Sequence, residues 1–134
     1  MKRALLIATL ILVAANASEI ENYLKELAIE AKKEDPNFKA FSAERGKKIF
    51  FTYGIGKRGK KIACTSCHTE DLTKPGKNIF TGKEIEPLSP KVNKKRLKNL
   101  KDVKKWLKRN FKDVYNKEGS PKEKGDVLTY ILNQ

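Results

Sequence analysis

Apolar residues recur at helical spacing near the beginning of the chain. The first such face comprises Ile20, Tyr23, Leu24, Leu27 and Ala31. Ser18 and Glu21 precede it in the order of a capping box, in which the serine side chain accepts a hydrogen bond from the backbone N–H of the glutamate. Pro36 follows the face and disfavours helical backbone at Asp35. The pattern therefore predicts one amphipathic helix between Ser18 and Asp35.

The middle of the chain predicts one further helix and then mostly loops. Ser42 is suited to start a helix that runs from about Ala43 to Tyr53, and the glycines of residues 54–59 predict a loop after it. Residues 70–93 are irregular and are interrupted by Pro75, Pro87 and Pro90. A loop of that length is uncommon in a small domain unless it lines a functional site.

The C-terminal part of the chain again predicts helices. From Asn99 onward, one helical face comprises Val103, Trp106, Leu107, Asn110, Phe111 and Val114. A last helix begins at Ser120 and Pro121, where Glu123 completes a second capping box. Its inner face is expected to comprise Val127, Leu128, Ile131 and Leu132. Since no segment shows the alternation of a strand, the pattern predicts an all-α protein with four to five helices and long loops.

Residues 1–17 have the three parts of a signal peptide. The first residues are basic, residues 4–14 are apolar, and residues 15–17 read ANA, which is suited to cleavage. The apolar run is shorter than the roughly 20 residues that a membrane span needs, which disfavours the alternative of an uncleaved anchor. We therefore expect cleavage after Ala17, export to the periplasm, and one small mature domain of residues 18–134.

The chain is strongly basic, with a formal net charge of +14. An exported protein rarely meets nucleic acid, so nucleic-acid binding is not the expected reason for this charge. A positive surface outside the cytoplasm favours docking onto an acidic partner protein or an anionic lipid surface. The alternative is that the lysines only solvate the surface.

The only two cysteines lie in the sequence CTSCH at residues 64–68. Two thiols at that spacing can reach the two vinyl groups of one porphyrin, and the adjacent histidine can ligate its iron; this is the spacing of covalent haem c attachment. A zinc site would need four ligands, and a redox-active CxxC would normally follow a strand, so both alternatives are disfavoured. We predict one haem c bound through Cys64 and Cys67, with His68 as the proximal iron ligand.

The order of helices and loops resembles that of class I cytochrome c. In that fold the N-terminal helix crosses the C-terminal helix where a glycine makes room for an aromatic residue. Gly46 and Phe50 would form the first half of this crossing, and Gly125, Leu128 and Tyr130 would supply the second. A glycine within a helix costs about 1 kcal/mol relative to alanine, which favours a packing role for Gly46.

The second axial position of the iron lacks a conventional ligand. His68 is the sole histidine, and the sole methionine is Met1, which would leave with the signal peptide. Three options remain: an open or water-bound site, a lysine amine, or a weak donor such as asparagine. A lysine would have to lose a proton from a group whose pKa is about 10.4. Asn110 is the polar exception on an otherwise apolar helical face, and it either ligates iron or hydrogen-bonds within the core.

Four segments together resemble the sphaeroides haem protein family of class I c-type cytochromes. These segments are CTSCH at 64–68, TGKEIEPLSP at 81–90, KKWLKRNF at 104–111 and SPKEKGDVLTYIL at 120–132. The resemblance implies that Asn110, four residues after Trp106, is the axial ligand in the oxidised state. It also implies that reduction releases this ligand, so that oxygen or another small diatomic molecule can bind. The electron-transfer partners that it implies are a dihaem cytochrome c and a membrane cytochrome b.

The chain departs from this family pattern just after Asn110. The resemblance implies a second cysteine pair there, joined as a disulfide, but Phe111 stands at the first position and residues 117–119 stand around the second. Asn93, in the sequence PKVN, is a second candidate ligand, because loops commonly deliver distal ligands in class I cytochromes. Trp106 is expected either near the distal face of the haem or as filler of the core.

The leading functional interpretation is a periplasmic electron carrier with a redox-linked ligand switch. Ferric iron tolerates a hard amide oxygen, whereas ferrous iron prefers softer donors, so reduction should weaken the bond to Asn110. The alternative is a haem enzyme that reduces or detoxifies oxygen or nitrogen oxides. A catalytic cytochrome acting on sulfur compounds is disfavoured, because the chain has no cysteine or histidine outside CTSCH to assist such chemistry.

Overall fold

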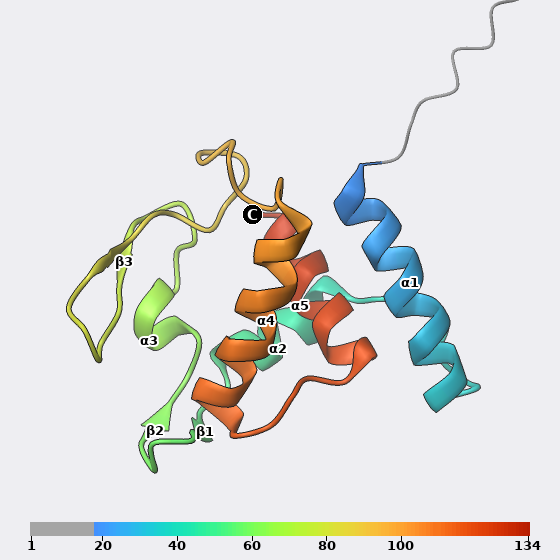
Figure 1. Cartoon of the computed structure of the whole chain (residues 1–134), viewed down its shortest axis with the longest axis horizontal. Helices are drawn as coiled ribbons and strands as arrows, with labels where there is room; N and C mark the ends of the chain where they lie inside the picture. The colour runs from blue at the N-terminus through green and yellow to red at the C-terminus, as the bar shows by residue number, and fades with distance from the viewer. Residues whose placement is uncertain (1–17) are drawn as a thin grey trace, which may run out of the picture.

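The structure is a computed structural model that describes residues 18–134, and the predicted signal peptide lies outside the described residues. Within that range the helices are α1 Glu19–Glu34, α2 Ala43–Phe51, α3 Thr65–His68, α4 Leu100–Tyr115 and α5 Pro121–Leu132 (Figure 1). The prediction of an all-α fold with long loops is confirmed. None of these helices is long and apolar enough to cross a membrane.

Local capping chemistry sets where four of the helices begin. One side chain accepts a hydrogen bond from a backbone N–H in the first turn of each of α1, α2, α4 and α5; these side chains belong to Ser18, Ser42, Asn99 and Ser120. Capping boxes pair Ser18 with Glu21 and Ser120 with Glu123, as predicted. Each such cap stabilises its helix by about 1 kcal/mol. The starts of these helices are therefore encoded by residues that are close together in the sequence.

Two short antiparallel ladders were not predicted. β1 Gly54–Ile55 pairs with β2 Lys61–Ile62, and β3 Gly76–Lys77 pairs with β4 Glu84–Ile85. Strands of two residues are too short to show the alternation of apolar and polar positions by which a strand is recognised. The ladders close two hairpins within the segments that the sequence predicts as loops.

Two helix ends also differ from prediction. α2 ends at Phe51 rather than at Tyr53, and Thr52 caps it by donating its hydroxyl to the carbonyl oxygen of Lys48. Leu132, predicted on the inner face of α5, is 37% exposed. It is the last residue of the helix, where no neighbouring element covers it, while the remainder of the predicted inner face is buried; those residues are Val127, Leu128 and Ile131.

Helices α2 and α5 cross with their backbones in contact. A Cβ atom at Gly46 would collide with the carbonyl group of Asp126 and would come within 2.8 Å of Cβ of Tyr130. The rings of Phe50 and Tyr130 pack at the same crossing, with their centroids 5.6 Å apart. The predicted packing role of Gly46 is therefore confirmed. Gly125 has a different partner from the one expected, because the ring of Phe41 lies over it.

An ion pair strengthens this crossing at the start of α2. The buried carboxylate of Asp126 accepts hydrogen bonds from Arg45 Nε at 2.8 Å, from Arg45 Nη2 at 2.9 Å and from the backbone N–H of Ser42 at 2.8 Å. Arg45 also donates to the carbonyl oxygen of Ala40 at 2.7 Å. Hydrogen bonds to charged groups contribute about 1.5–3 kcal/mol each, so this cluster fixes the rotation of α2 relative to α5.

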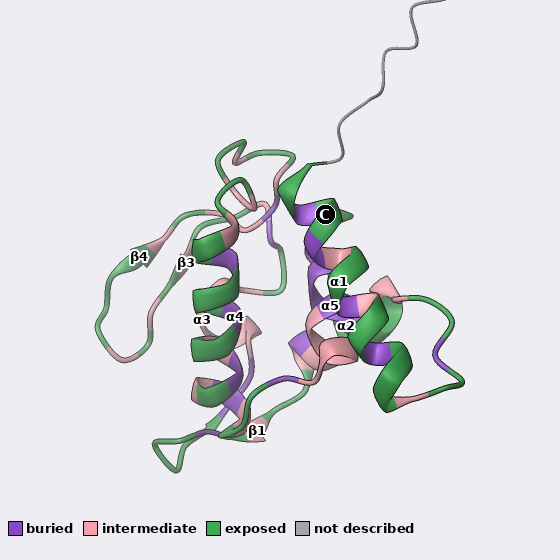
Figure 2. Ribbon diagram, turned by 45° about the vertical axis from the view of Figure 1, so that its right-hand side comes forward, coloured by how far each residue is buried: buried purple, intermediate pink, exposed green. Residues whose placement is uncertain are grey.

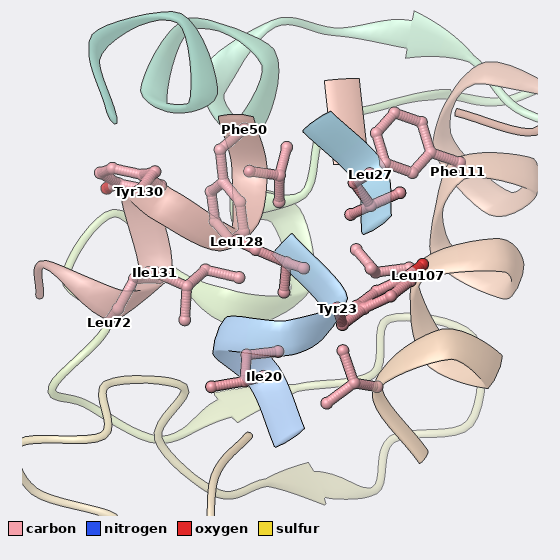
Figure 3. Packing of buried hydrophobic residues seen from close by; sticks show 12 residues of the cluster. Ile20, Tyr23, Leu27, Phe50, Leu72, Leu107, Phe111, Leu128, Tyr130 and Ile131 are labelled. Atoms are coloured by element: carbon pink, nitrogen blue, oxygen red, sulfur yellow. The ribbon is translucent and has the colours of Figure 1, made fainter. Parts of the chain in front are cut away.

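Helix α1 covers the core on one side. The core cluster comprises Ile20, Tyr23, Leu27, Phe50, Leu72, Val103, Leu107, Phe111, Val127, Leu128, Tyr130 and Ile131. Figure 3 shows Ile20 and Tyr23 of α1 between the side chains of α4 and those of α5. On α4 the buried positions form a single stripe, and the opposite side of this helix is exposed (Figure 2). The core therefore holds α4 by one face only.

Replacing Gly46 with alanine tests the crossing. Alanine would favour an isolated helix by about 1 kcal/mol, but here its methyl group must displace the backbone of α5. We expect the free energy of unfolding, measured by urea denaturation of the haem-loaded protein, to fall by about 1–3 kcal/mol. Glu44→Ala, at an exposed position of the same helix, is the control and should change stability by less than about 0.5 kcal/mol. A stabilised Gly46→Ala protein would show that the helices do not cross in this way.

Candidate haem site

The two cysteines and the histidine of CTSCH lie on one short helical turn. Cys64 caps α3, and its carbonyl oxygen accepts hydrogen bonds from the backbone N–H groups of Cys67 at 3.3 Å and His68 at 3.1 Å. Residues three and four positions apart share one face of a helix. The turn therefore directs two thiols and one imidazole to the same side, as attachment and ligation of a single porphyrin require.

Burial makes the imidazole of His68 a competent metal ligand. Burial, together with the positive charge of Arg96, lowers the pKa of His68 to about 4. The ring is therefore neutral at pH 7 and keeps a lone pair for a metal. The ring of Phe50 packs against it, with the two centroids 5.9 Å apart. A Cβ atom at Gly76 would collide with the carbonyl oxygen of Cys67, so the backbone of β3 packs directly against the peptide before His68.

The half-buried cysteine that caps α3, Cys64, is suited to a neutral thioether. Burial raises the pKa of the Cys64 thiol to about 12, so this sulfur is uncharged at pH 7. Cys64 packs against the core cluster that also contains Phe50, Leu107 and Phe111. A thioether is likewise uncharged and apolar, so attaching a porphyrin there buries no charge. The donor set of α3 therefore fits a covalently attached haem.

Arg96 is a site residue that the sequence analysis missed. Its Nε donates to the carbonyl oxygen of Pro87 at 2.9 Å and its Nη2 to that of Glu86 at 2.7 Å. These bonds tie together two parts of the long loop that runs from α3 to α4 (Figure 1). The same guanidinium lowers the pKa of His68. The one available signal was an arginine within a run of lysines, because a guanidinium can bind two carbonyl groups at once.

The side chain of Asn110 is free to act as a ligand. Asn110 lies half-buried on α4 beside Phe111, on the flank of the buried stripe. Among the other asparagines of residues 18–134, four make side-chain hydrogen bonds within the protein: Asn78, Asn93, Asn99 and Asn133. The side chains of Asn22, Asn37 and Asn116 make none within this range, but those residues are exposed, whereas Asn110 is half-buried. Within the same range the amide of Asn110 makes none. No hydrogen bond within these residues has to be broken before this amide can bind an external group such as a metal.

Asn93, the second candidate, is occupied by its own loop. Its Nδ2 donates to the carbonyl oxygen of Pro87 at 3.2 Å and to the carboxylate of Glu86 at 3.4 Å, while its Oδ1 accepts from the backbone N–H of Lys95 at 3.2 Å. Ligation by Asn93 would break these bonds. The geometry therefore favours Asn110 over Asn93.

Trp106 does not fill the core. It is 47% exposed, and the cationic groups of Lys105 and Arg109 lie 5.2 Å and 5.0 Å from the centre of its ring system. It stands one helical turn before Asn110, and residues four apart lie on the same face of a helix. The core-filler interpretation is wrong, and a place beside the haem pocket stays a prediction.

Comparisons with known proteins identify relatives of this chain. Residues 36–131 match a family described as a domain of unknown function, DUF1924. The chain is 34% identical over 120 residues to cytochrome c'' of Methylophilus methylotrophus, which covers 90% of this chain and 83% of that protein. It is 38% identical over 92 residues to the cytochrome c-type protein SHP of Cereibacter sphaeroides. This alignment covers 69% of this chain and 70% of that protein.

This chain belongs to the family of cytochrome c'' and the sphaeroides haem protein. The crystal structure of oxidised cytochrome c'' from Methylophilus methylotrophus superposes with a TM-score of 0.76 at 35% identity, over 85% of this chain and 93% of that one. The structure of oxidised SHP, described as an oxygen-binding cytochrome c, gives a TM-score of 0.76 at 31% identity, over 89% of this chain and all of that one. The predicted class I cytochrome c fold is therefore confirmed, and the chain is a monohaem c-type cytochrome.

An aromatic ring packs at the place where the family pattern implies a disulfide. The ring of Phe111, at the first of the two positions, lies 2.9 Å from where a Cβ atom of Gly119 would be, near the second. Both cysteines of this cytochrome lie in α3 and its cap, so neither can supply that cross-link. The segment after α4 is thus held by the contact of a ring with a glycine.

The last turn of α4 is held from a second side by the β1–β2 hairpin. The backbones are in direct contact, because a Cβ atom at Gly56 would collide with the carbonyl oxygen of Asp113. The backbone N–H of Lys57 donates a hydrogen bond to the carbonyl oxygen of Lys112 at 3.2 Å. The side chain of Lys57 also forms an ion pair, with Nζ 2.9 Å from the Asp113 carboxylate. The hydroxyl of Tyr115 reaches the carbonyl oxygens at the end of α2, one of them at 2.8 Å. These contacts fix the helix end one turn after Asn110.

Gly119→Ala tests whether the contact between Phe111 and Gly119 stabilises the folded protein in place of a disulfide. The added methyl group would press on the ring of Phe111, so we expect the free energy of unfolding to fall by about 1–3 kcal/mol in urea denaturation. Phe111→Leu makes room for the methyl group, so the double variant should lose less than the sum of the two single losses. Strict additivity would mean that residues 111 and 119 do not touch. A thiol reductant should leave the unfolding midpoint of the haem-loaded parent protein unchanged.

Proposed function

We propose that this protein is an exported electron-transfer cytochrome in which Asn110 is the distal iron ligand of the oxidised state. Covalent haem is held by Cys64 and Cys67, and the neutral imidazole of His68 binds the proximal face of the iron. The observation that carries the proposal is the half-buried Asn110 amide, which has no hydrogen-bond partner within residues 18–134. The inventory of donors supports it, because His68 is the sole histidine and Met1 the sole methionine.

The same ligand makes the site responsive to reduction. The haem iron supplies a one-electron change between ferric and ferrous states, and an uncharged amide oxygen is a better donor for the former. We infer that Asn110 leaves the iron on reduction and that oxygen or another small diatomic molecule can then bind. Two relatives support this inference: SHP is described as oxygen-binding, and the solution structure of cytochrome c'' addresses haem-ligand detachment.

The protein around Asn110 is built to limit how far the ligand moves. The contacts of Phe111 with Gly119 and of the β1–β2 hairpin with Asp113 hold the helix immediately after the ligand. We therefore expect release to be a rotation of the Asn110 side chain, with α4 remaining in place. A side chain that stays near the iron can rebind when the iron is oxidised again, so the switch is reversible.

We infer export from the N-terminal segment, and covalent haem attachment is consistent with it. Residues 1–17 have the composition of a signal peptide, and both thiols of the chain are consumed by haem attachment, which leaves none for a disulfide. We place the mature protein, residues 18–134, in the periplasm. Its electron-transfer partner is an acidic protein, for which a dihaem cytochrome c or a membrane cytochrome b are the candidates that the family resemblance implies.

Asn110→Ala should alter iron coordination in the oxidised protein but not in the reduced protein. The ferric spectrum is expected to change from six-coordinate low-spin to high-spin or water-bound, because alanine has no donor atom. The ferrous protein should bind carbon monoxide rapidly with or without the substitution, since in our proposal the ligand has already left. Optical spectra in both oxidation states and flash photolysis of the carbon monoxide complex measure these outcomes.

Asn93→Ala is the matched control, since it removes an asparagine from the loop near the same site. It should leave both spectra unchanged. A spectral change in Asn93→Ala with none in Asn110→Ala would assign the ligand to the loop. A reduced parent protein that stays low-spin and ignores carbon monoxide would contradict the proposed release.

A further inference from the structure

The β1–β2 hairpin carries a basic surface beside the haem anchor. Between Glu44 and Glu70 the chain contains no acidic residue, while residues 57–61 read KRGKK. We call Arg58, Lys60 and Lys61, together with the rings of Tyr53 and Phe80, the hairpin surface. All three cationic residues are exposed, and Tyr53 is 57% exposed. Such a surface attracts anionic partners and contains no acidic group that would weaken its field.

Aromatic rings hold the cations of this surface in place. The guanidinium of Arg58 lies 3.9 Å from the centre of the Phe80 ring, and Lys60 Nζ lies 6.0 Å from it. Lys61 Nζ lies 5.9 Å from the centre of the Tyr53 ring. A stacked guanidinium loses less entropy when it binds a carboxylate, because its plane is already oriented. The arrangement is therefore suited to carboxylates at fixed positions.

The hairpin surface is rigidly connected to the haem site. Lys61 precedes Cys64 by three residues, which limits the distance between their Cα atoms to about 11 Å. On its other side the hairpin packs on the end of α4 through Gly56 and Lys57. Figure 1 shows the hairpin at the end of the molecule where α4 terminates, away from α1. A protein bound here would lie next to the covalent attachment of the haem.

Two exposed lysines of α4 are less suited to this role. On the exposed side of α4, Lys104 is 3.8 Å from Glu26 and Lys108 is 3.1 Å from Glu118, so part of their charge is neutralised. Within residues 18–134 none of the three cations of the hairpin surface forms such an ion pair. Free charges next to the cofactor contribute more to a docking site than paired charges at a distance from it.

We propose that the hairpin surface is the docking site for the acidic face of a redox partner protein. The proposal rests on the proposed electron-transfer function and assigns its partner to one face of the molecule. One electron would pass from the reduced cofactor of the partner to ferric haem, which becomes ferrous. A protein partner is favoured over lipid because stacked, oriented cations match carboxylates of fixed geometry, which a fluid headgroup layer does not require.

The test removes three charges from two faces of the haem-loaded protein. The first variant is R58Q/K60Q/K61Q, and the control is K25Q/K33Q/K39Q, which changes net charge equally at exposed positions on and just after α1. The probe is a reduced acidic flavodoxin. Its anionic flavin hydroquinone gives one electron to the ferric haem and becomes the neutral semiquinone. This step transfers no proton. Stopped-flow absorbance at low ionic strength gives the second-order rate constant.

We expect R58Q/K60Q/K61Q to lower this rate constant about tenfold and to flatten its dependence on salt, because the steering charges are gone. The control should lower it less than about threefold. Reduction by uncharged lumiflavin should proceed at the parent rate in both variants, which shows that the haem itself is unaltered. If the two variants lower the rate constant equally, the proposal is overturned, because the rate would then depend on net charge and not on the hairpin surface.

Two further measurements separate the alternatives. Cosedimentation with phosphatidylglycerol vesicles measures whether the hairpin surface binds lipid. If R58Q/K60Q/K61Q loses vesicle binding while its rate constant with flavodoxin is unchanged, the proposal is overturned in favour of a membrane contact. Carbon monoxide binding to the reduced variants tests the ligand switch independently of docking. If it fails in all of them, including the parent, the proposed release of Asn110 is wrong, while the flavodoxin rates still decide the docking site.

Discussion

The chain contains one histidine, and that constraint shapes the whole site. His68 is positioned by its place at the end of α3, by partial burial, and by the backbone of β3 packed against the preceding peptide. If His68 binds the proximal face of the iron, residues 18–134 contain no methionine or second imidazole for the opposite face. The ligand on that face would then have to be a weak donor, such as an amide oxygen, or a lysine amine whose pKa is strongly lowered. A change in the charge of the iron can displace a weak donor. In our proposal, the composition of the chain therefore couples electron transfer to ligand exchange.

Helix α4 is restrained at three separate places. Its buried stripe packs on the core, its end meets the β1–β2 hairpin, and Phe111 covers Gly119 where the family pattern implies a disulfide. A ring against a glycine depends on close packing, whereas a disulfide constrains the chain whether or not it is folded. This cytochrome therefore holds the end of α4 by contacts that exist only in the native state. The hairpin that restrains α4 also carries the basic surface, so the proposed docking site and the proposed distal ligand depend on the same hairpin.

Local chemistry explains which features the sequence could predict. The starts of α1, α2, α4 and α5 depend on a capping residue and its neighbours within one turn, and CTSCH is contiguous, so each was recognisable. The features that were missed join residues far apart in sequence. Phe41 over Gly125, Arg96 beside His68 and the hairpin on α4 all depend on how the helices pack. Asn110 is an intermediate case: its helical face could be predicted, but the freedom of its amide and the involvement of Asn93 in its loop could not.

Crystal structures of the haem-loaded protein in both oxidation states test the central claim most directly. The distance to be measured is the one between the iron and Oδ1 of Asn110. We expect a bond in the oxidised crystal and its loss, by rotation of the side chain, after reduction of the same crystal form. An oxidised structure with a lysine, Asn93 or another side chain over the iron, and with Asn110 turned away, would contradict the account.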